Sequence, residues 1–142
     1  MYSTIQPERE MKAQALSSFN YAQSYHKTAL RDLESTNRRF DNDLLYNLIS
    51  MSFEKYMVAL LARYDWNASS HLPVLLYKEA LIFEPELDAT FKETAKLIGS
   101  FESICSLDSF GYKTPNDLQI KQMIEGLDKL NQHVTTRMTE IT

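Results

Sequence analysis

The sequence has little of what usually interrupts or cross-links a chain. It holds one cysteine, three glycines and four prolines in 142 residues. The single cysteine, Cys105, excludes an intrachain disulfide and any metal cluster built from paired cysteines. Its apolar setting, FESICSL, predicts a small buried hydrophobic side chain rather than a nucleophile. The scarcity of glycine predicts long helices and excludes a glycine-rich phosphate loop.

Long hydrophobic runs are also missing. The longest uncharged hydrophobic run, Leu44 to Phe53, is about half as long as a bilayer span requires. The N-terminal segment, MYSTIQPEREMK, lacks the apolar core of a signal peptide. We therefore expect no membrane interaction and a cytoplasmic location.

An excess of positive charge is absent as well. The formal net charge of -4 argues against non-specific nucleic-acid binding, which needs a surplus of Lys and Arg facing phosphates. The densest basic stretch contains Lys27, Arg31, Arg38 and Arg39, and acidic residues dilute it. We interpret it as a solvated surface rather than a phosphate site.

What the chain does have is amphipathic periodicity, which predicts one domain over residues 1–142 with five helices. We expect the first helix from about Pro7, the second from Leu44 to Tyr64, and a short third helix capped by Ser70. Pro85 opens the fourth, and Thr114, as the cap, opens the last. The predicted fold is all-α: an up-and-down antiparallel bundle of four long helices plus one short helix.

The second helix is apolar on nearly every side, so it is predicted to lie in the middle of the bundle. The first and last helices carry one apolar stripe each: Met11, Ala15, Phe19, Ala22, His26, Ala29 and Leu33 on the first, and Ile120, Met123, Ile124, Leu127, Leu130, Val134 and Met138 on the last. The third helix is expected to turn Leu72, Leu75, Leu76 and Ala80 inward.

The three histidines receive different interpretations. His26 falls on the apolar stripe of the first helix, which is typical of a hydrogen-bonded core histidine. His133 stands in the polar sequence LNQHVTT and is expected to face solvent, while His71 is expected to begin the third helix. No spacing typical of a metal site links them, so we predict neither a metal nor a cofactor. Glu84 and Glu86, beside a proline, are interpreted as charges at a helix start.

The segment MSFEKYMVALLARY, a polar loop and then SSHLPVLLYKEA resemble the HEPN family of small helical bundles. The family pattern on the second helix matches Glu54-Lys55 followed by Ala59-Leu60-Leu61, and the following loop matches Ser70-His71-Leu72. The resemblance covers most of the chain and implies the bundle fold. HEPN proteins include metal-independent ribonucleases and non-catalytic partners of nucleotidyltransferases.

The ribonucleases of the family carry an arginine followed closely by a histidine at the start of the last long helix. That spacing is missing, and before the last helix the sequence SFGYK keeps Tyr112 but lacks the family's arginine. The resemblance therefore implies a non-catalytic interaction or nucleotide-associated module, with a nucleotidyltransferase partner or a nucleotide ligand. The alternatives are a divergent ribonuclease, with Arg63 and His71 as catalytic candidates, and a structural scaffold.

Tyrosines are numerous: Tyr21, Tyr25, Tyr46, Tyr56, Tyr64, Tyr77 and Tyr112, joined by Trp66. Because tyrosine and tryptophan pack well while keeping a polar tip, they are common at interfaces, and a homodimer is the natural hypothesis. Packing at the edge of the core is the alternative. The expected binding or interface residues are Glu54, Lys55, Tyr64, Trp66, His71 and Tyr112.

The pair Glu54-Lys55 has two interpretations. Neighbouring residues diverge around a helix, so the two charges do not pair with each other. They either stand at the edges of the apolar stripes, with the Lys55 stem lying on the core, or line a polar pocket or dimer groove.

Overall fold

The chain folds entirely into helices in the part that the structure describes. The structure is a computed structural model that describes the backbone of residues 7–105 and 113–140, and the side chains of residues 10–101 and 113–140. The helices are α1 (Pro7–Glu34), α2 (Asn42–Arg63), α3 (Pro73–Phe83), α4 (Thr90–Cys105) and α5 (Asp117–Thr139). The all-α prediction is confirmed over these residues. None of the helices found there is both long and apolar enough to cross a membrane.

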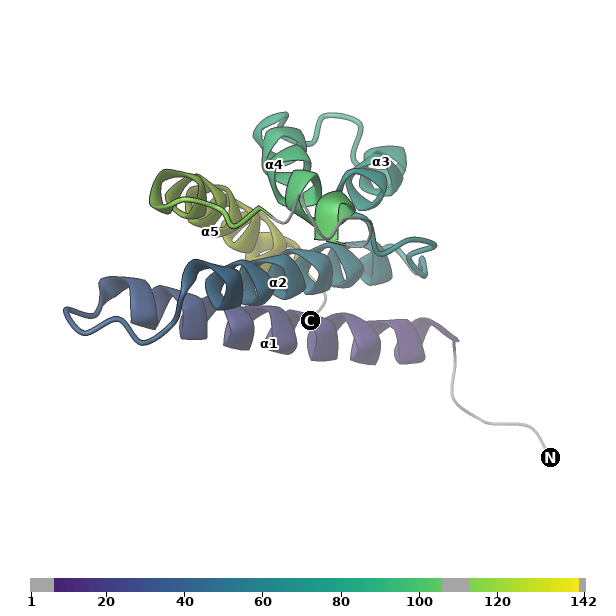
Figure 1. Cartoon of the computed structure of the whole chain (residues 1–142). Coiled ribbons are helices and arrows are strands. Elements are labelled where there is room, and N and C mark those ends of the chain that lie inside the picture. Colours follow the sequence, from purple (N-terminus) through teal and green to yellow (C-terminus); the bar gives the residue numbers. More distant parts are fainter. Residues whose placement is uncertain (1–6, 106–112, 141–142) are drawn as a thin grey trace.

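The helices are arranged around α2. Figure 1 shows α1 and α2 lying side by side, with α3, α4 and α5 on the other side of α2. Helix α2 packs mainly on α1, α3 and α5, whereas α4 packs mainly on α3 and α5 and reaches α2 through Tyr46, whose hydroxyl donates to the Ile98 carbonyl at 2.7 Å. Helix α1 therefore rests mainly on α2, and α3 and α4 do not cover it.

The central position of α2 follows from its sequence. Its side chains are buried toward all three of its neighbours, among them Leu45, Ile49, Phe53, Tyr56, Met57, Leu60 and Leu61, as predicted. Ser52 is fully buried too, and its hydroxyl donates to the Ala22 carbonyl at 2.7 Å. Burying each of the large apolar side chains contributes about 1.5–3 kcal/mol, so this helix organises the core.

The inner stripe of the last helix is confirmed in full, because all seven of its predicted residues are buried. On the short helix α3 the prediction is half wrong. Leu76 and Ala80 are buried, but Leu72 and Leu75 are exposed. Helix α3 covers only one side of its neighbours, so the apolar residues on its other side stay in solvent.

Three predicted helix starts are wrong by a few residues. Helix α5 is capped by Asn116, not Thr114: the Asn116 side chain accepts from the Gln119 N–H, and the Gln119 side chain accepts from the Asn116 N–H. This reciprocal capping box satisfies two amides that the helix start leaves unpaired. Helix α4 begins at Thr90 rather than Pro85.

The third displaced start is that of α3, whose cap is Leu72 and carries no side-chain hydrogen bond. The expected cap, Ser70, instead accepts a hydrogen bond from the Leu72 N–H, in the loop before the helix. Pro73 takes the first helical position, as expected, because its missing N–H costs nothing there.

His26 is a hydrogen-bonded core histidine, as predicted. It is buried between α1, α2 and α5, with Nδ1 2.8 Å from the Tyr56 hydroxyl and Nε2 2.7 Å from the Asp128 carboxylate. Burial, and then the charge of Asp128, raises the pKa of Tyr56, so this phenol stays protonated and can donate to His26. The hydrogen bonds of His26 to Tyr56 and Asp128 therefore connect α1 to α2 and to α5.

Helices α4 and α5 approach closely at Gly126. A Cβ at this position would lie 2.8 Å from the Thr94 Cβ and closer still to its hydroxyl, and rotation of Thr94 could not relieve that contact. Gly126 is buried, and the glycine lets the two helix backbones meet.

We expect Gly126→Ala to destabilise the protein by about 1–3 kcal/mol, because overpacking at Thr94 outweighs the better helix propensity of alanine. The matched control is Gly99→Ala on α4, where an added Cβ meets nothing within 4 Å. The free energy of unfolding of Gly99→Ala should be higher than that of the unmodified chain by about 0.5–1 kcal/mol. Urea denaturation followed by circular dichroism measures both, and equal effects of the two variants would contradict the close packing.

Candidate functional site

A buried carboxylate, Glu84, gathers side chains from three helices at one end of the molecule. Glu84 caps the C-terminal end of α3, and its side chain is only 9% exposed. The Tyr64 hydroxyl, at the end of α2, donates to Oε2 at 2.5 Å. From α5, His133 Nε2 lies 2.7 Å from Oε1, and Arg137 donates from Nε to Oε2 at 2.9 Å and from a terminal nitrogen to Oε1 at 3.2 Å. We call these four residues the Glu84 cluster.

The charges in the Glu84 cluster reinforce one another. Burial opposes ionisation of Glu84, but hydrogen bonds from Arg137 and Tyr64, with the nearby charges, outweigh it and hold the pKa of this carboxyl below its ordinary value. Burial and the bond to Glu84 raise the pKa of Tyr64, while Glu84 raises the pKa of Arg137. At neutral pH the cluster therefore contains a carboxylate, a guanidinium and a protonated phenol.

An open pocket of about 710 Å³ lies beside the Glu84 cluster. Phe83 forms one wall, where its ring stacks on Tyr64 with centroids 5.2 Å apart. Trp66 also packs against the Phe83 ring, with the two ring centroids 5.6 Å apart. Glu86 and Asp88 are exposed on the rim. The pocket thus has an aromatic wall and a rim that is mainly acidic.

The local turn after α2 places two of these aromatic residues. Asp65 takes a left-handed conformation, with φ of 60°, and the Trp66 N–H donates back to the Leu61 carbonyl at 3.1 Å. This bond, with that of the Asp65 N–H to Ala62, ends α2 in a Schellman turn. As a result Tyr64 and Trp66 flank the ring of Phe83.

The geometry limits what the Glu84 cluster can do chemically. A general base needs a free lone pair within reach of a substrate proton. Both oxygens of Glu84 are occupied by donors, and Arg137 also pairs with Glu140 at 3.7 Å. The arrangement is that of a structural contact, in which Glu84 connects the ends of α2 and α3 to α5.

Two of the predicted interface residues, Glu54 and His71, do meet. His71 Nδ1 lies 3.0 Å from Glu54 Oε2, although the His71 side chain is 87% exposed. This contact joins α2 to the loop before α3 and lies in solvent. Lys55 is half-buried on the outer side of α2. The last predicted residue, Tyr112, lies outside the described residues, as does the side chain of Cys105.

The two catalytic candidates have separate partners. Arg63 pairs with Glu140 at 3.7 Å and lies over the Tyr64 ring, 5.2 Å from its centroid. His71 contacts Glu54. Each side chain is engaged with its own neighbours.

Sequence reasoning missed the Glu84 cluster. His133 does not face solvent as expected, and Glu84 is not a helix-start charge but a buried acceptor. One signal was available: His133 and Arg137 are one helical turn apart, so they share a side of α5. Their partner is 49 and 53 residues away along the chain, which no local pattern reveals.

Among the described side chains, no group of three or more His, Cys, Asp and Glu residues is arranged to hold a metal ion. Comparisons with family models, with curated proteins and with solved structures gave no match to this chain. The HEPN resemblance therefore stays a prediction.

The Glu84 cluster yields a stability prediction. Glu84→Gln should destabilise the protein by about 2–4 kcal/mol at pH 7, because it leaves the Arg137 guanidinium without its buried counter-charge. A lowered pKa in the folded state means that the contribution of Glu84 is complete above about 4.5, its ordinary value, and is lost as the pH falls through the folded pKa.

The difference in melting temperature between the unmodified chain and Glu84→Gln should accordingly narrow below about pH 4.5. Glu86→Gln removes the same charge two residues away at an exposed position and should change stability by less than about 0.5 kcal/mol. If both variants have the same melting temperature across the pH range, the Glu84 carboxylate does not stabilise the contact between α2, α3 and α5.

Proposed function

We propose that this chain is a non-catalytic, HEPN-like interaction module that forms a homodimer through the outer side of the α1–α2 pair. The observation that carries the proposal is an exposed, uncharged surface on these two helices. The HEPN resemblance adds the expectation of an up-and-down bundle and of a nucleotidyltransferase partner or nucleotide ligand.

The surface lacks charge because of two sequence segments. No Asp, Glu, Lys or Arg occurs between Lys12 and Lys27 on α1, or between Asp43 and Glu54 on α2. The hydrogen bond from Ser52 to the Ala22 carbonyl places these segments beside each other. Charged residues are depleted at the centre of protein interfaces, whereas an ordinary solvent-facing helix surface is rich in them.

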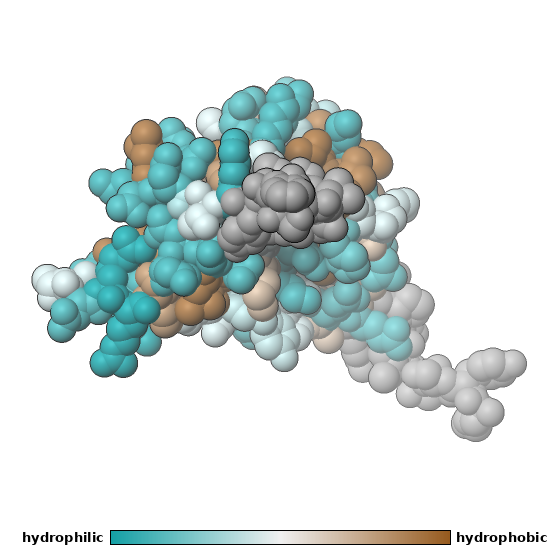
Figure 2. All heavy atoms as spheres, in the orientation of Figure 1, coloured by the Kyte–Doolittle hydropathy of each residue, from teal (hydrophilic) through white to brown (hydrophobic). Residues whose placement is uncertain are grey.

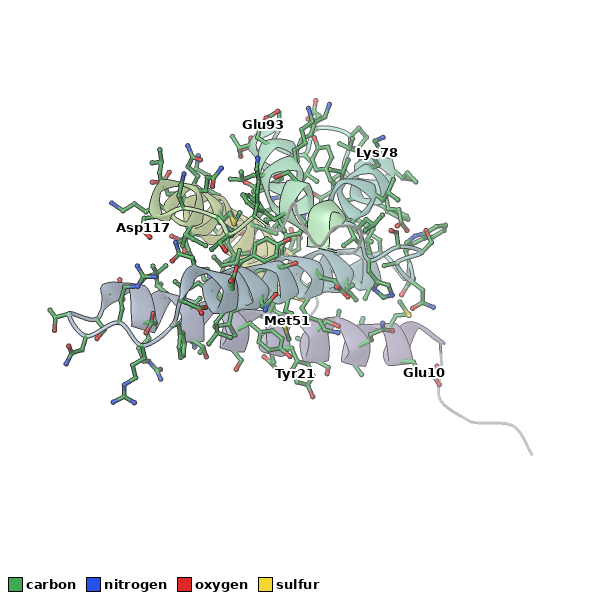
Figure 3. All side chains as sticks on the ribbon, viewed as in Figure 1. Glu10, Tyr21, Met51, Lys78, Glu93 and Asp117 are labelled. Atoms are coloured by element: carbon green, nitrogen blue, oxygen red, sulfur yellow. The ribbon has the colours of Figure 1, made fainter. Side chains whose placement is uncertain are left out.

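Large apolar side chains lie exposed on this surface. Tyr21 on α1 is 56% exposed, and on α2 both Met51 and Leu44 are 42% exposed. Figure 3 shows the labelled Tyr21 and Met51 close together where α1 and α2 run side by side. In Figure 2, a group of brown apolar spheres lies over the beginning of α2 on the same side of the molecule. We call this the α1–α2 face, made of Gln14, Ser17, Tyr21, Ser24, Tyr25, Thr28, Leu44, Asn47, Leu48 and Met51.

A second copy of the chain is the occupant that fits this face best. In a two-fold dimer the same surface meets itself, so any charge near the axis would face a like charge. An uncharged face avoids that repulsion. Tyrosine and methionine, which it exposes, are also enriched in interfaces. Lys55 continues the same stripe of α2 one turn beyond Met51 and would lie at the edge of the contact.

We expect the unmodified chain, of 16.5 kDa, to sediment as a dimer. The double variant Tyr21→Glu/Met51→Glu should sediment as a monomer, because four carboxylates would then meet at the two-fold axis of the dimer. Sedimentation velocity over a range of protein concentrations measures this. The fold should persist, since both side chains are exposed.

The control is Ile82→Glu on α3, where the side chain is 66% exposed and the helix lies on the other side of α2 from α1 (Figure 1). It should leave the dimer intact. A monomeric unmodified chain, or a control that dissociates as fully as the double variant, would overturn the proposal.

The ribonuclease alternative has a direct test. We expect the purified protein to leave RNA intact in the presence of EDTA, because Arg63 and His71 are engaged with separate carboxylates. Cleavage that persists in EDTA and disappears in His71→Ala would instead make the chain a divergent ribonuclease. Glu54→Gln is the companion variant, since it removes the carboxylate charge beside His71 without touching the imidazole.

A further inference from the structure

We propose that the turn between α1 and α2 binds a small molecule carrying a phosphate group, in a hollow of about 400 Å³. Arg31 at the end of α1 and Arg39 in the following loop line the hollow, together with Ser35, Asn37 and Phe40. The site is separate from the Glu84 cluster, and its argument does not depend on the proposed dimer.

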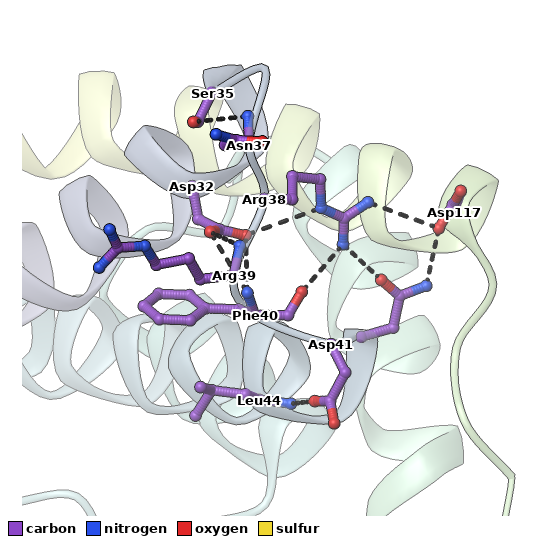
Figure 4. Close-up of polar contacts among 10 residues, drawn as sticks. Asp32, Ser35, Asn37, Arg38, Arg39, Phe40, Asp41, Leu44 and Asp117 are labelled. Carbon is purple, nitrogen blue, oxygen red and sulfur yellow. Dashed lines mark hydrogen bonds and ion pairs between the residues drawn. The ribbon is translucent and has the colours of Figure 1, made fainter.

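The one carboxylate that lines the hollow is already satisfied. Asp32 is buried and accepts from the backbone N–H groups of Arg39 at 2.8 Å and of Phe40 at 3.3 Å. Arg38 adds an ion pair to it at 3.7 Å. Figure 4 shows these bonds converging on Asp32. The backbone N–H groups and Arg38 thus satisfy the oxygens of Asp32, and the guanidinium groups of Arg31 and Arg39 do not pair with it.

The arginines of this turn differ in their engagement. Arg38 donates to the Asn42 side chain at 2.8 Å and to the Phe40 carbonyl, and it also pairs with Asp117. Within the described residues, the guanidinium groups of Arg31 and Arg39 form no hydrogen bond or ion pair. In Figure 4 the Arg39 side chain extends past the Phe40 ring, away from the Arg38 contacts. Two free, planar five-donor groups beside one hollow suit a phosphate, which guanidinium binds in bidentate fashion.

Two neutral donors complete the lining. The Ser35 hydroxyl accepts the Asn37 N–H at 3.1 Å, so its own proton remains available to a ligand. The amide side chain of Asn37 has no partner among the described residues. Donors therefore outnumber free acceptors around this hollow, which favours an anion over a cation. Half-buried Phe40 supplies an apolar wall for the organic part of the ligand.

Two features oppose an anion, and both are weaker than the arginines. The C-terminal end of α1 carries roughly half a negative charge, against two full positive charges. Glu34 lines an adjoining hollow of about 360 Å³, where Lys27 offsets it. The sequence alone favours a solvated surface for the basic stretch, and Arg31 and Arg39 are exposed. The proposal departs from that interpretation because the turn places further hydrogen-bond donors beside these two arginines.

The test is a titration followed by two-dimensional NMR of the ¹⁵N-labelled chain, in a low-salt buffer without phosphate, using inorganic phosphate and adenosine monophosphate as probes. We expect saturable shifts of the amides of residues 31–40. The double variant Arg31→Gln/Arg39→Gln should weaken binding by at least about tenfold, because each lost charged hydrogen bond contributes that much or more. Tighter binding of the nucleotide than of phosphate supports an organic phosphate ligand that uses Phe40, and equal binding supports free phosphate.

The control is Lys92→Gln/Lys121→Gln, which removes the same charge from exposed positions on α4 and α5 and should change affinity by less than about twofold. Arg39→Lys keeps the charge and should still weaken binding, since it loses the bidentate geometry. The proposal is overturned if neither probe gives saturable shifts at probe concentrations up to about 10 mM. It is also overturned if the lysine control loses as much affinity as the double arginine variant.

Discussion

The structure depends on one constraint, which is that α2 is apolar on nearly every side and has to be covered from every direction. Helices α1, α3 and α5 cover three sides of it. The stripe that begins at Leu44 and continues through Met51 is left to solvent. A helix of this composition normally lies inside a protein, and within the described residues the other helices leave this stripe uncovered. A second copy would supply the missing cover, and this physical need links the core to the proposed dimer.

Residue types that suggest chemistry are used mostly to join helices. His26 connects α1 to α2 and α5, Glu84 connects α3 to α2 and α5, and Asp32 holds the turn between α1 and α2. In each case a buried polar group finds donors or acceptors, as burial in a low-dielectric interior requires. The partners of His26 and Glu84 lie on helices distant in sequence, whereas those of Asp32 are backbone N–H groups of the next loop. Arg31 and Arg39 take no part in these contacts among the described residues, so their guanidinium groups are available to a ligand.

Sequence patterns predicted what depends on periodicity. They identified the helices, the central position of α2 and the buried state of His26, because spacing along a helix decides which side a residue takes. They failed where a competing local bond or a distant partner decides. Asn116 displaces Thr114 as a cap because Gln119 completes its capping box. His133 is drawn out of solvent by Glu84, a residue that no pattern on α5 indicates. Sequence patterns therefore did not predict the Glu84 cluster, although one of its members, Tyr64, is among the expected binding or interface residues.

The proposed dimer and the phosphate site share one helix. Thr28, which lines the hollow, follows Tyr21 by about two turns and lies on the same side of α1. A ligand at Arg31 and Arg39 would therefore sit at the end of the α1–α2 face. Any difference in its affinity between monomer and dimer must appear as an equal change in dimer affinity when the ligand is bound. Because the partner would bring a second α1 close to the hollow, such a ligand would shift self-association only if its affinity differs between monomer and dimer.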